Sequence, residues 1–165
     1  AGGDTTAQLE LRFARDVLGL EPDAVVIEAG INDLKAIGVM PYRSSALIEN
    51  TIKRLKFFVD ELQRKHIPVV LITIIPPGPI ELSRRLLWSD QILPAVETVN
   101  RAIRSWDGPE LFVDDADLAL VEKGQVRKAY SNDALHLNER GYQALAPMVE
   151  DAVRRAVSSV AKGNY

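Results

Sequence analysis

The feature that most constrains the fold is an alternation of two patterns along the chain. Short β-branched runs bounded by turn residues are typical of buried strands, and residues 68–75 (PVVLITII) are the clearest example. Residues 24–29, which end at Gly30, and residues 111–113 are two shorter runs of the same kind. Each of these runs predicts one strand.

Around these runs, apolar residues recur at intervals of three and four, which indicates amphipathic helices. The residues predicted to face the core are Ala7, Leu11, Ala14 and Leu18 in the first helix; Ile48, Ile52, Leu55, Val59 and Leu62 in the second; Ile92, Val96, Val99 and Ile103 in the third; and Tyr142, Leu145, Val149, Val153, Ala156 and Val160 in the last. We expect Asp4 to cap the first helix, Gly19 to end it, and Asn138 to cap the last one. Pro147 is expected to kink or split that last helix, because it lacks a backbone donor.

The resulting order of elements is helix, strand, helix, strand, helix, strand, helix. This alternation predicts an α/β fold with a parallel sheet, right-handed crossovers and helices on both faces. The sequence has no internal repeat, low-complexity tract or linker. A single domain over residues 1–165 is therefore expected.

Composition and charge exclude several classes of function. The chain contains no cysteine, which excludes disulfides, thiol nucleophiles and zinc–cysteine sites. Its formal net charge of −3 gives no basic footprint for nucleic acid or for an anionic membrane surface. No apolar run approaches the length of a membrane span. Composition therefore indicates an ordinary globular protein and little more.

Two polar segments follow predicted strands, where sites form in parallel sheets. One of them contains Asp133 and His136, three residues apart and just before a helix. The Asp133 carboxylate can accept the Nδ1 hydrogen of His136, which fixes the tautomer and leaves Nε2 as a general base. An exposed loop aspartate beside a surface histidine is the competing interpretation, because such pairs also occur by chance.

The other segment is Gly30-Ile31-Asn32-Asp33, directly after the first strand. A rigidly held Asn32 amide there can donate to a developing oxyanion, and Gly3 in the opening loop can offer an unobstructed backbone N–H. The alternatives are a turn asparagine that bonds its own backbone and a glycine required only by a tight turn.

Taken together and in order, these segments resemble blocks of the SGNH (GDSL-type) hydrolase family. Gly2 to Thr6 (Gly-Gly-Asp-Thr-Thr) is similar to the second block, Gly30 to Asp33 to the Gly-x-Asn-Asp block, and Asp133 to His136 to the Asp-x-x-His block. Gly141 and Tyr142 after the histidine also fit the family. The resemblance covers nearly the whole chain.

The resemblance implies a three-layer α/β/α, flavodoxin-like parallel sheet and a serine ester hydrolase. His136 would be the general base, Asp133 would orient it, and Asn32 and Gly3 would form the oxyanion hole. The implied reaction is hydrolysis of short-chain, carbohydrate O-acyl or lysophospholipid esters through an acyl-enzyme. It needs no metal and no cofactor.

The Gly-Asp-Ser nucleophile block of that family is absent from the sequence. None of the serines lies in the strand-to-turn context of a nucleophile: they are Ser44, Ser45, Ser83, Ser89, Ser105, Ser131, Ser158 and Ser159. In the resembled fold, strands precede the second block and one of them is central. We therefore expect a nucleophile-bearing segment upstream, cleaved, omitted or supplied as a separate N-terminal fragment that completes the sheet. A noncatalytic carbohydrate- or partner-binding module on the same fold, without a nucleophile, is the alternative.

Overall fold

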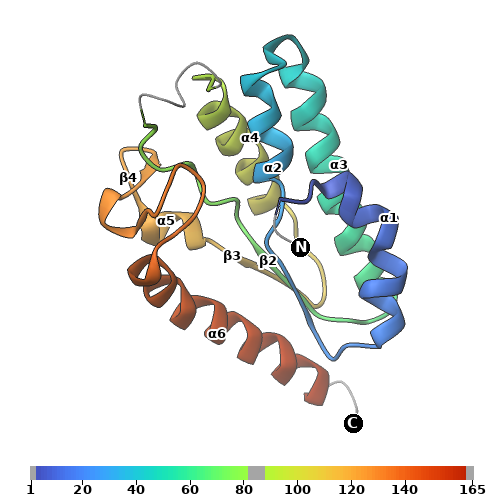
Figure 1. Ribbon diagram of the computed structural model, residues 1–165. Coiled ribbons are helices and arrows are strands. Elements are labelled where there is room, and N and C mark those ends of the chain that lie inside the picture. Colours follow the sequence, from blue (N-terminus) through green and yellow to red (C-terminus); the bar gives the residue numbers. More distant parts are fainter. Residues whose placement is uncertain (1–2, 82–87, 163–165) are drawn as a thin grey trace.

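The computed structural model describes residues 3–81 and 88–162, and its helices and strands alternate along the chain (Figure 1). The helices are α1 (Thr6–Asp16), α2 (Ile31–Leu34), α3 (Ser44–Gln63), α4 (Ile92–Arg104), α5 (Ala116–Leu120) and α6 (Glu139–Lys162). The strands are β1 (Val25–Ile27), β2 (Val69–Ile72), β3 (Leu111–Asp114), β4 (Val121–Glu122) and β5 (Gln125–Val126). Short 3₁₀ turns cover Leu18–Leu20, Lys35–Gly38, Pro41–Arg43 and Lys128–Tyr130.

Strands β1, β2 and β3 form one parallel sheet in that order. Val70 of β2 pairs with Val26 of β1 on one side and with Phe112 of β3 on the other. All four residues of β2 are buried, as expected of a central strand in a parallel sheet. The small β4–β5 hairpin is antiparallel and separate. The predicted α/β fold class is confirmed.

Helices cover both faces of this sheet. Figure 1 shows α6 on one side of the strands and α1 and α3 on the other. One core lies beneath α1, α3 and α4 and includes Phe58 and Leu71, whereas the other lies beneath α6 and includes Val70 and Ala152. Within the described residues, none of the helices combines the length and the apolar character that a membrane crossing requires.

Helix α6 runs unbroken from Glu139 to Lys162 through Pro147, so the proline does not split it. Its predicted cap is confirmed, because Asn138 Oδ1 accepts the backbone N–H of Gly141 at 3.0 Å. All four predicted core residues of α4 are buried as well.

The buried face of α1 differs from the predicted one. Leu11 is 90% exposed, whereas Phe13 is buried with its ring centroid 4.8 Å from that of Phe58 in α3. The sequence offers two overlapping apolar pairs at helical spacing, Ala7 with Leu11 and Leu9 with Phe13. The pair that carries the large aromatic ring faces the core, because Phe13 buries the larger apolar area.

The ends of α1 also differ from expectation. Thr5 caps the helix, because its side chain accepts the Gln8 N–H while the Gln8 side chain accepts the Thr5 N–H. The Asp4 carboxylate instead receives a hydrogen bond from Arg12. The helix ends at Asp16, so Gly19 lies in the following 3₁₀ turn rather than at the helix end.

The carboxyl end of β2 is fixed by a buried asparagine. Asn100 of α4 accepts the Ile74 N–H and donates to the Ile74 carbonyl, each at 2.8 Å. Its Nδ2 also donates to Asp117 at 3.3 Å. Because Asn100 satisfies both backbone groups of Ile74, that residue is held where β2 gives way to the loops above the sheet.

Candidate active site

The chain turns sharply after β1, at Gly30. Gly30 has a φ of +116°, and a Cβ built there would lie 2.6 Å from Ile74 Cδ1 and 3.1 Å from Thr51 Cγ2. Only glycine fits both this backbone conformation and this close approach. The turn starts α2 immediately, so that Asn32 and Asp33 lie in its single turn at the carboxyl end of β1.

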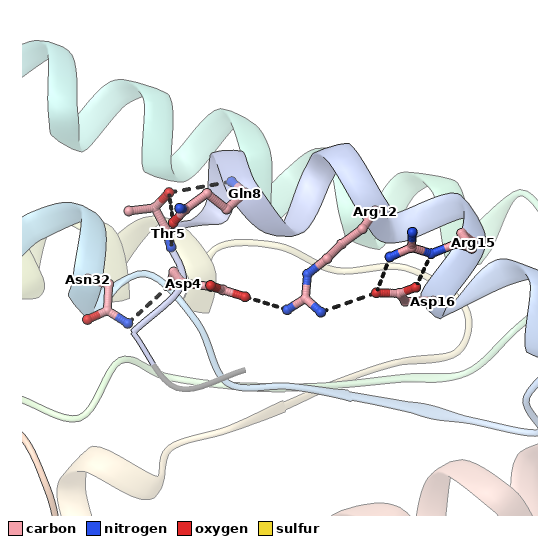
Figure 2. Close-up of polar contacts among 7 residues, drawn as sticks. All are labelled: Asp4, Thr5, Gln8, Arg12, Arg15, Asp16 and Asn32. Carbon is pink, nitrogen blue, oxygen red and sulfur yellow. Dashed lines mark hydrogen bonds and ion pairs between the residues drawn. The ribbon is translucent and has the colours of Figure 1, made fainter.

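The opening loop lies directly beside Asn32. Asn32 Nδ2 donates to the backbone carbonyl of Asp4 at 3.0 Å, as Figure 2 shows. Gly3, the residue before Asp4, has a φ of +90°. The structure thus brings together Gly3 and Asn32, the two residues predicted to form an oxyanion hole, although their assignment to that role stays a prediction. Gly2, also part of the resembling block, lies outside the described residues.

Gly3 and Asn32 both line a cavity of about 290 Å³ at this edge of the sheet. The lining residues are Gly3, Asp4, Leu9, Glu28, Ala29, Gly30, Ile31, Asn32, Ile74, Ile75, Leu135, Leu137 and Tyr142. The opening loop, the ends of β1 and β2, and the segment around His136 therefore surround one space. This arrangement follows from the parallel sheet, in which the carboxyl ends of the strands lie at the same edge.

Asp133 and His136 contact each other as predicted. His136 Nδ1 lies 3.0 Å from each carboxylate oxygen of Asp133. Because a carboxylate only accepts, Nδ1 carries the hydrogen and Nε2 is the ring nitrogen left as a base. Within residues 3–81 and 88–162, no side chain or backbone group hydrogen-bonds to Nε2. The histidine side chain is 68% exposed, so Nε2 is accessible.

The Asp133 carboxylate is held in its charged form by its own loop. The backbone N–H of Leu135 donates to Asp133 Oδ1 at 2.8 Å, and that of His136 donates to the same oxygen at 2.9 Å. These bonds, led by the one from Leu135, lower the pKa of Asp133 to about 2. The carboxylate therefore stays ionised at neutral pH and can stabilise a protonated imidazole.

Asp133 and His136 do not line this cavity themselves, although their neighbours do. Leu135 and Leu137 line the cavity that Gly3 and Asn32 line, whereas His136 between them does not. The catalytic roles of these residues are therefore proposals, although all four belong to the same edge of the sheet.

Among the described serines, none is placed to donate a hydrogen bond to His136 Nε2. Ser131 is nearest in sequence, but its hydroxyl donates to the Asp133 carbonyl at 2.6 Å. Ser105 and Ser159 donate to carbonyls of their own helices. Ser83 lies outside the described residues. In the described part of the chain, no three carboxylates or histidines cluster as metal ligands would.

Sequence reasoning did not single out Glu28 or the partners of Asp33. Glu28 follows β1 and lines the cavity, and desolvation of its carboxylate raises its pKa. Its signal in the sequence is a carboxylate within an otherwise apolar run, in VVIEAG. Asp33 accepts a hydrogen bond from the hydroxyl of Thr6, which lies 27 residues away and which no local pattern indicates as its partner.

Comparison with known proteins agrees with this architecture. The sequence model of the GDSL-like lipase/acylhydrolase family matches residues 1–144. No curated protein matches the chain.

Solved structures with the same fold include a GDSL-like lipase and acetylxylan esterases. A GDSL-like lipase from Bacteroides thetaiotaomicron has a TM-score of 0.70 and 20% identity, over 93% of this chain and 73% of its own. An acetyl xylan esterase has a TM-score of 0.67 and 24% identity, over 93% of this chain and 78% of its own. A catalytic mutant of Axe2, an acetylxylan esterase from Geobacillus stearothermophilus, has a TM-score of 0.61 and 24% identity, over 94% of this chain and 68% of its own.

Proposed function

This chain belongs to the GDSL-like lipase/acylhydrolase family, and we propose that it contributes the base and the oxyanion hole of a serine esterase. The observation that carries the proposal is the contact of His136 Nδ1 with both Asp133 oxygens at 3.0 Å. A histidine oriented by an ionised carboxylate, with Nε2 accessible, is the arrangement that activates a hydroxyl nucleophile.

In the proposed reaction, His136 Nε2 removes the proton from a serine hydroxyl as that oxygen attacks the ester carbonyl. The imidazolium that forms is stabilised by Asp133, which remains ionised. His136 then gives the proton to the leaving alkoxide, and an acyl-enzyme remains. Water, deprotonated in turn by His136, hydrolyses the acyl-enzyme and restores the serine.

The oxyanion of each tetrahedral intermediate would lie between Gly3 and Asn32. Asn32 Nδ2 uses one hydrogen on the Asp4 carbonyl and keeps a second one for the oxyanion. The backbone N–H of Gly3 would be the second donor. Donors that are already oriented before the reaction stabilise the developing charge without reorganisation.

We propose that the nucleophilic serine lies on a segment outside these 165 residues, in the same chain or in a separate fragment. Support comes from the described serines, none of which contacts His136, and from the edge position of β1. Val26 of β1 is 43% exposed, whereas Val70 beside it in β2 is fully buried. An apolar groove of about 310 Å³ runs between β1 and α1. A further strand paired to β1 would cover this surface.

The substrate class we propose is a carboxylic ester with a short acyl group, including O-acetylated carbohydrate. The cavity of about 290 Å³ is small. Two of the fold neighbours are acetylxylan esterases, which supports the carbohydrate ester over the lysophospholipid.

A fluorophosphonate probe, which labels activated serines, tests this function on the complete gene product. We expect it to label a serine outside residues 1–165, and His136→Ala to abolish the labelling. His66→Ala is the matched control, because His66 lies at the opposite end of β2 and its side chain is 87% exposed. Labelling of any serine within the chain, or labelling that survives His136→Ala, would overturn the assignment. A protein that takes no label but binds a glycan would be the binding module instead.

A further inference from the structure

We propose that Asp33 and Thr6 form a positioning pair that sets the distance between Gly3 and Asn32. This inference rests on the proposed function, in which those two residues donate to the oxyanion. Neither Asp33 nor Thr6 would touch the substrate. Their role would be to hold two segments that are far apart in sequence in one geometry.

The pair is buried and doubly bonded. Asp33 Oδ2 accepts the Thr6 backbone N–H at 2.8 Å, and Asp33 Oδ1 accepts the Thr6 hydroxyl at 2.7 Å. Thr6 is fully buried and Asp33 is 7% exposed. A buried carboxylate with two donors aimed at its two oxygens is fixed in both position and rotation, because losing either bond leaves a buried polar atom unpaired.

The bonds next to this pair place it in the site. Asn32 donates to the carbonyl of Asp4, and its neighbour Asp33 accepts from Thr6. Asn32 and Asp33, which are consecutive in α2, therefore hold Asp4 and Thr6 at the start of the chain. Gly3 is the next residue along, so its position relative to Asn32 depends on these contacts.

The other described hydrogen bonds of the opening loop connect it to α1 and not to α2. The carboxylate of Asp4 receives a hydrogen bond from Arg12, which also contacts Asp16 (Figure 2). Thr5 and Gln8 close the capping box. All of these partners belong to α1 or its cap, so they move with α1 and do not fix it against α2. Among the bonds described here, those of Asn32 and Asp33 are the ones that join the loop to α2.

The position of Thr6 at the N-terminus of α1 favours a carboxylate as its partner. Thr6 is the first residue of α1, and its N–H is one of those that a helix leaves without an internal partner. The negative charge of Asp33 is favoured there by the helix dipole. The pair could therefore be a helix cap without any effect on catalysis, and the experiment must separate these two roles.

Thr6→Val and Thr6→Ser in the complete gene product separate them. Valine is close in shape to threonine but removes the hydroxyl donor, whereas serine keeps it. With p-nitrophenyl acetate as substrate, we expect Thr6→Val to lower kcat about tenfold with KM within about twofold, because oxyanion donors act in the transition state. Thr6→Ser should keep kcat within about twofold of the wild type.

Asp33→Asn is the second variant, in case Thr6→Val fails to fold. Asparagine can still accept the Thr6 N–H through Oδ1, so α1 keeps a cap, but its Nδ2 faces the Thr6 hydroxyl in place of an acceptor. We expect a kcat between those of wild type and Thr6→Val. A melting temperature that falls in Thr6→Val while kcat of the folded protein stays unchanged would overturn the inference, because the pair would then be a cap only.

A readout without catalysis distinguishes failure of the pair from failure of the proposed function. In ¹⁵N-labelled protein, the heteronuclear NOE of the Gly3 amide reports its order on the picosecond to nanosecond scale. We expect the NOE to fall in Thr6→Val and to stay at the wild-type value in Thr6→Ser. An unchanged NOE in Thr6→Val overturns the positioning pair, whereas a wild type that hydrolyses no ester overturns the proposed function alone.

Discussion

Asp33, in the half of the site that holds Gly3 and Asn32, is 7% exposed, whereas 68% of the His136 side chain in the other half is exposed. The hydrogen bonds of the first half join residues 27 and 28 positions apart. Those between Asp133 and the following residues span only two or three positions. We call the first half, with Gly3, Asn32 and Asp33, the tertiary half, because contacts between distant segments assemble it. The second half, with Asp133 and His136, is the loop-built half, because it is assembled within one loop.

This difference suits the chemistry that we propose for each half. Oxyanion donors must be fixed before charge develops, so they benefit from burial and from anchoring by distant segments. A general base must exchange protons with a nucleophile, a leaving group and water, so it benefits from an accessible ring nitrogen. Substitutions in the two halves should therefore have different consequences.

The largest effect is expected in the loop-built half, on activity rather than on stability. In Asp133→Asn, Oδ1 can still accept the N–H groups of Leu135 and His136, so the loop is kept. The new Nδ2 donor faces His136 Nδ1, which favours the tautomer with the hydrogen on Nε2 and removes the base. We expect kcat on p-nitrophenyl acetate to fall roughly 10³-fold or more in the complete gene product.

The control for that variant is Asp107→Asn, an exposed carboxylate in the turn after α4. It should leave kcat unchanged, and urea unfolding near neutral pH should show a small stability change for both variants. A similar kcat loss in Asp107→Asn would mean that net charge, and not the orientation of His136, governs the rate.

The tertiary half should respond with a loss of stability. Alanine at Gly30 would need a φ of +116° and would bring Cβ 2.6 Å from Ile74 Cδ1 in a packed core. We expect Gly30→Ala to lower the free energy of unfolding by roughly 2–4 kcal/mol, measured by urea denaturation. Gly124→Ala is the matched control, because Gly124 has a φ of +80° but nothing within 4 Å of a built Cβ.

For that control we expect a loss of about 1 kcal/mol, which isolates the cost of the backbone conformation. Equal losses in the two variants would show that the close approach of Ile74 contributes nothing.

The same contrast decides what could be predicted from the sequence. Strand β2 and the buried face of α4 were predicted because each has one unambiguous apolar pattern, in PVVLITII and in ILPAVETVNRAIR. The contact of Asp133 with His136 was predicted because its partners are three residues apart. Local chemistry is visible in a local pattern.

Where partners are distant, the sequence was silent or misleading. Nothing near Asp33 indicates Thr6, and the face of α1 was assigned to Leu11 because the ring of Phe58 that selects Phe13 lies in another helix. Asp4 was expected as the cap by residue preference, but Arg12 engages its carboxylate and Thr5 forms the capping box with Gln8. Tertiary competition, and not propensity, decided each of these cases.

A smaller loss of stability is expected where the loop-built half joins α6. Asn138 donates through Nδ2 to the carbonyls of Ala129 and Ser131, at 2.9 and 3.3 Å, while Oδ1 caps the helix. Asn138→Ala should lower the free energy of unfolding by about 1–2 kcal/mol in urea denaturation. Asn138→Asp keeps the cap but loses both donors, so it should show an intermediate loss; a loss as large as that of alanine would show that the helix cap contributes little.

The smallest effects, and the ones that contrast the two halves most directly, are opposite dependences of stability on pH. The pKa of Asp133 is lowered from 3.8 to about 2 by the donors of its own loop. A folded-state pKa below the unfolded value contributes stability that is present above about pH 4 and is lost as the pH falls towards 2. Urea unfolding should therefore show wild type losing its advantage over Asp133→Asn across that interval.

Glu28, at the cavity rim beside the tertiary half, should behave in the reverse sense. Burial raises its pKa above the usual 4.5, so its contribution is present at lower pH and is lost as the pH rises through the raised value. Relative to Glu28→Gln, wild type should therefore lose stability on going from acidic to neutral pH. Curves of the same sign for both variants would show that the Glu28 carboxylate is not desolvated at the cavity and that its pKa is not raised.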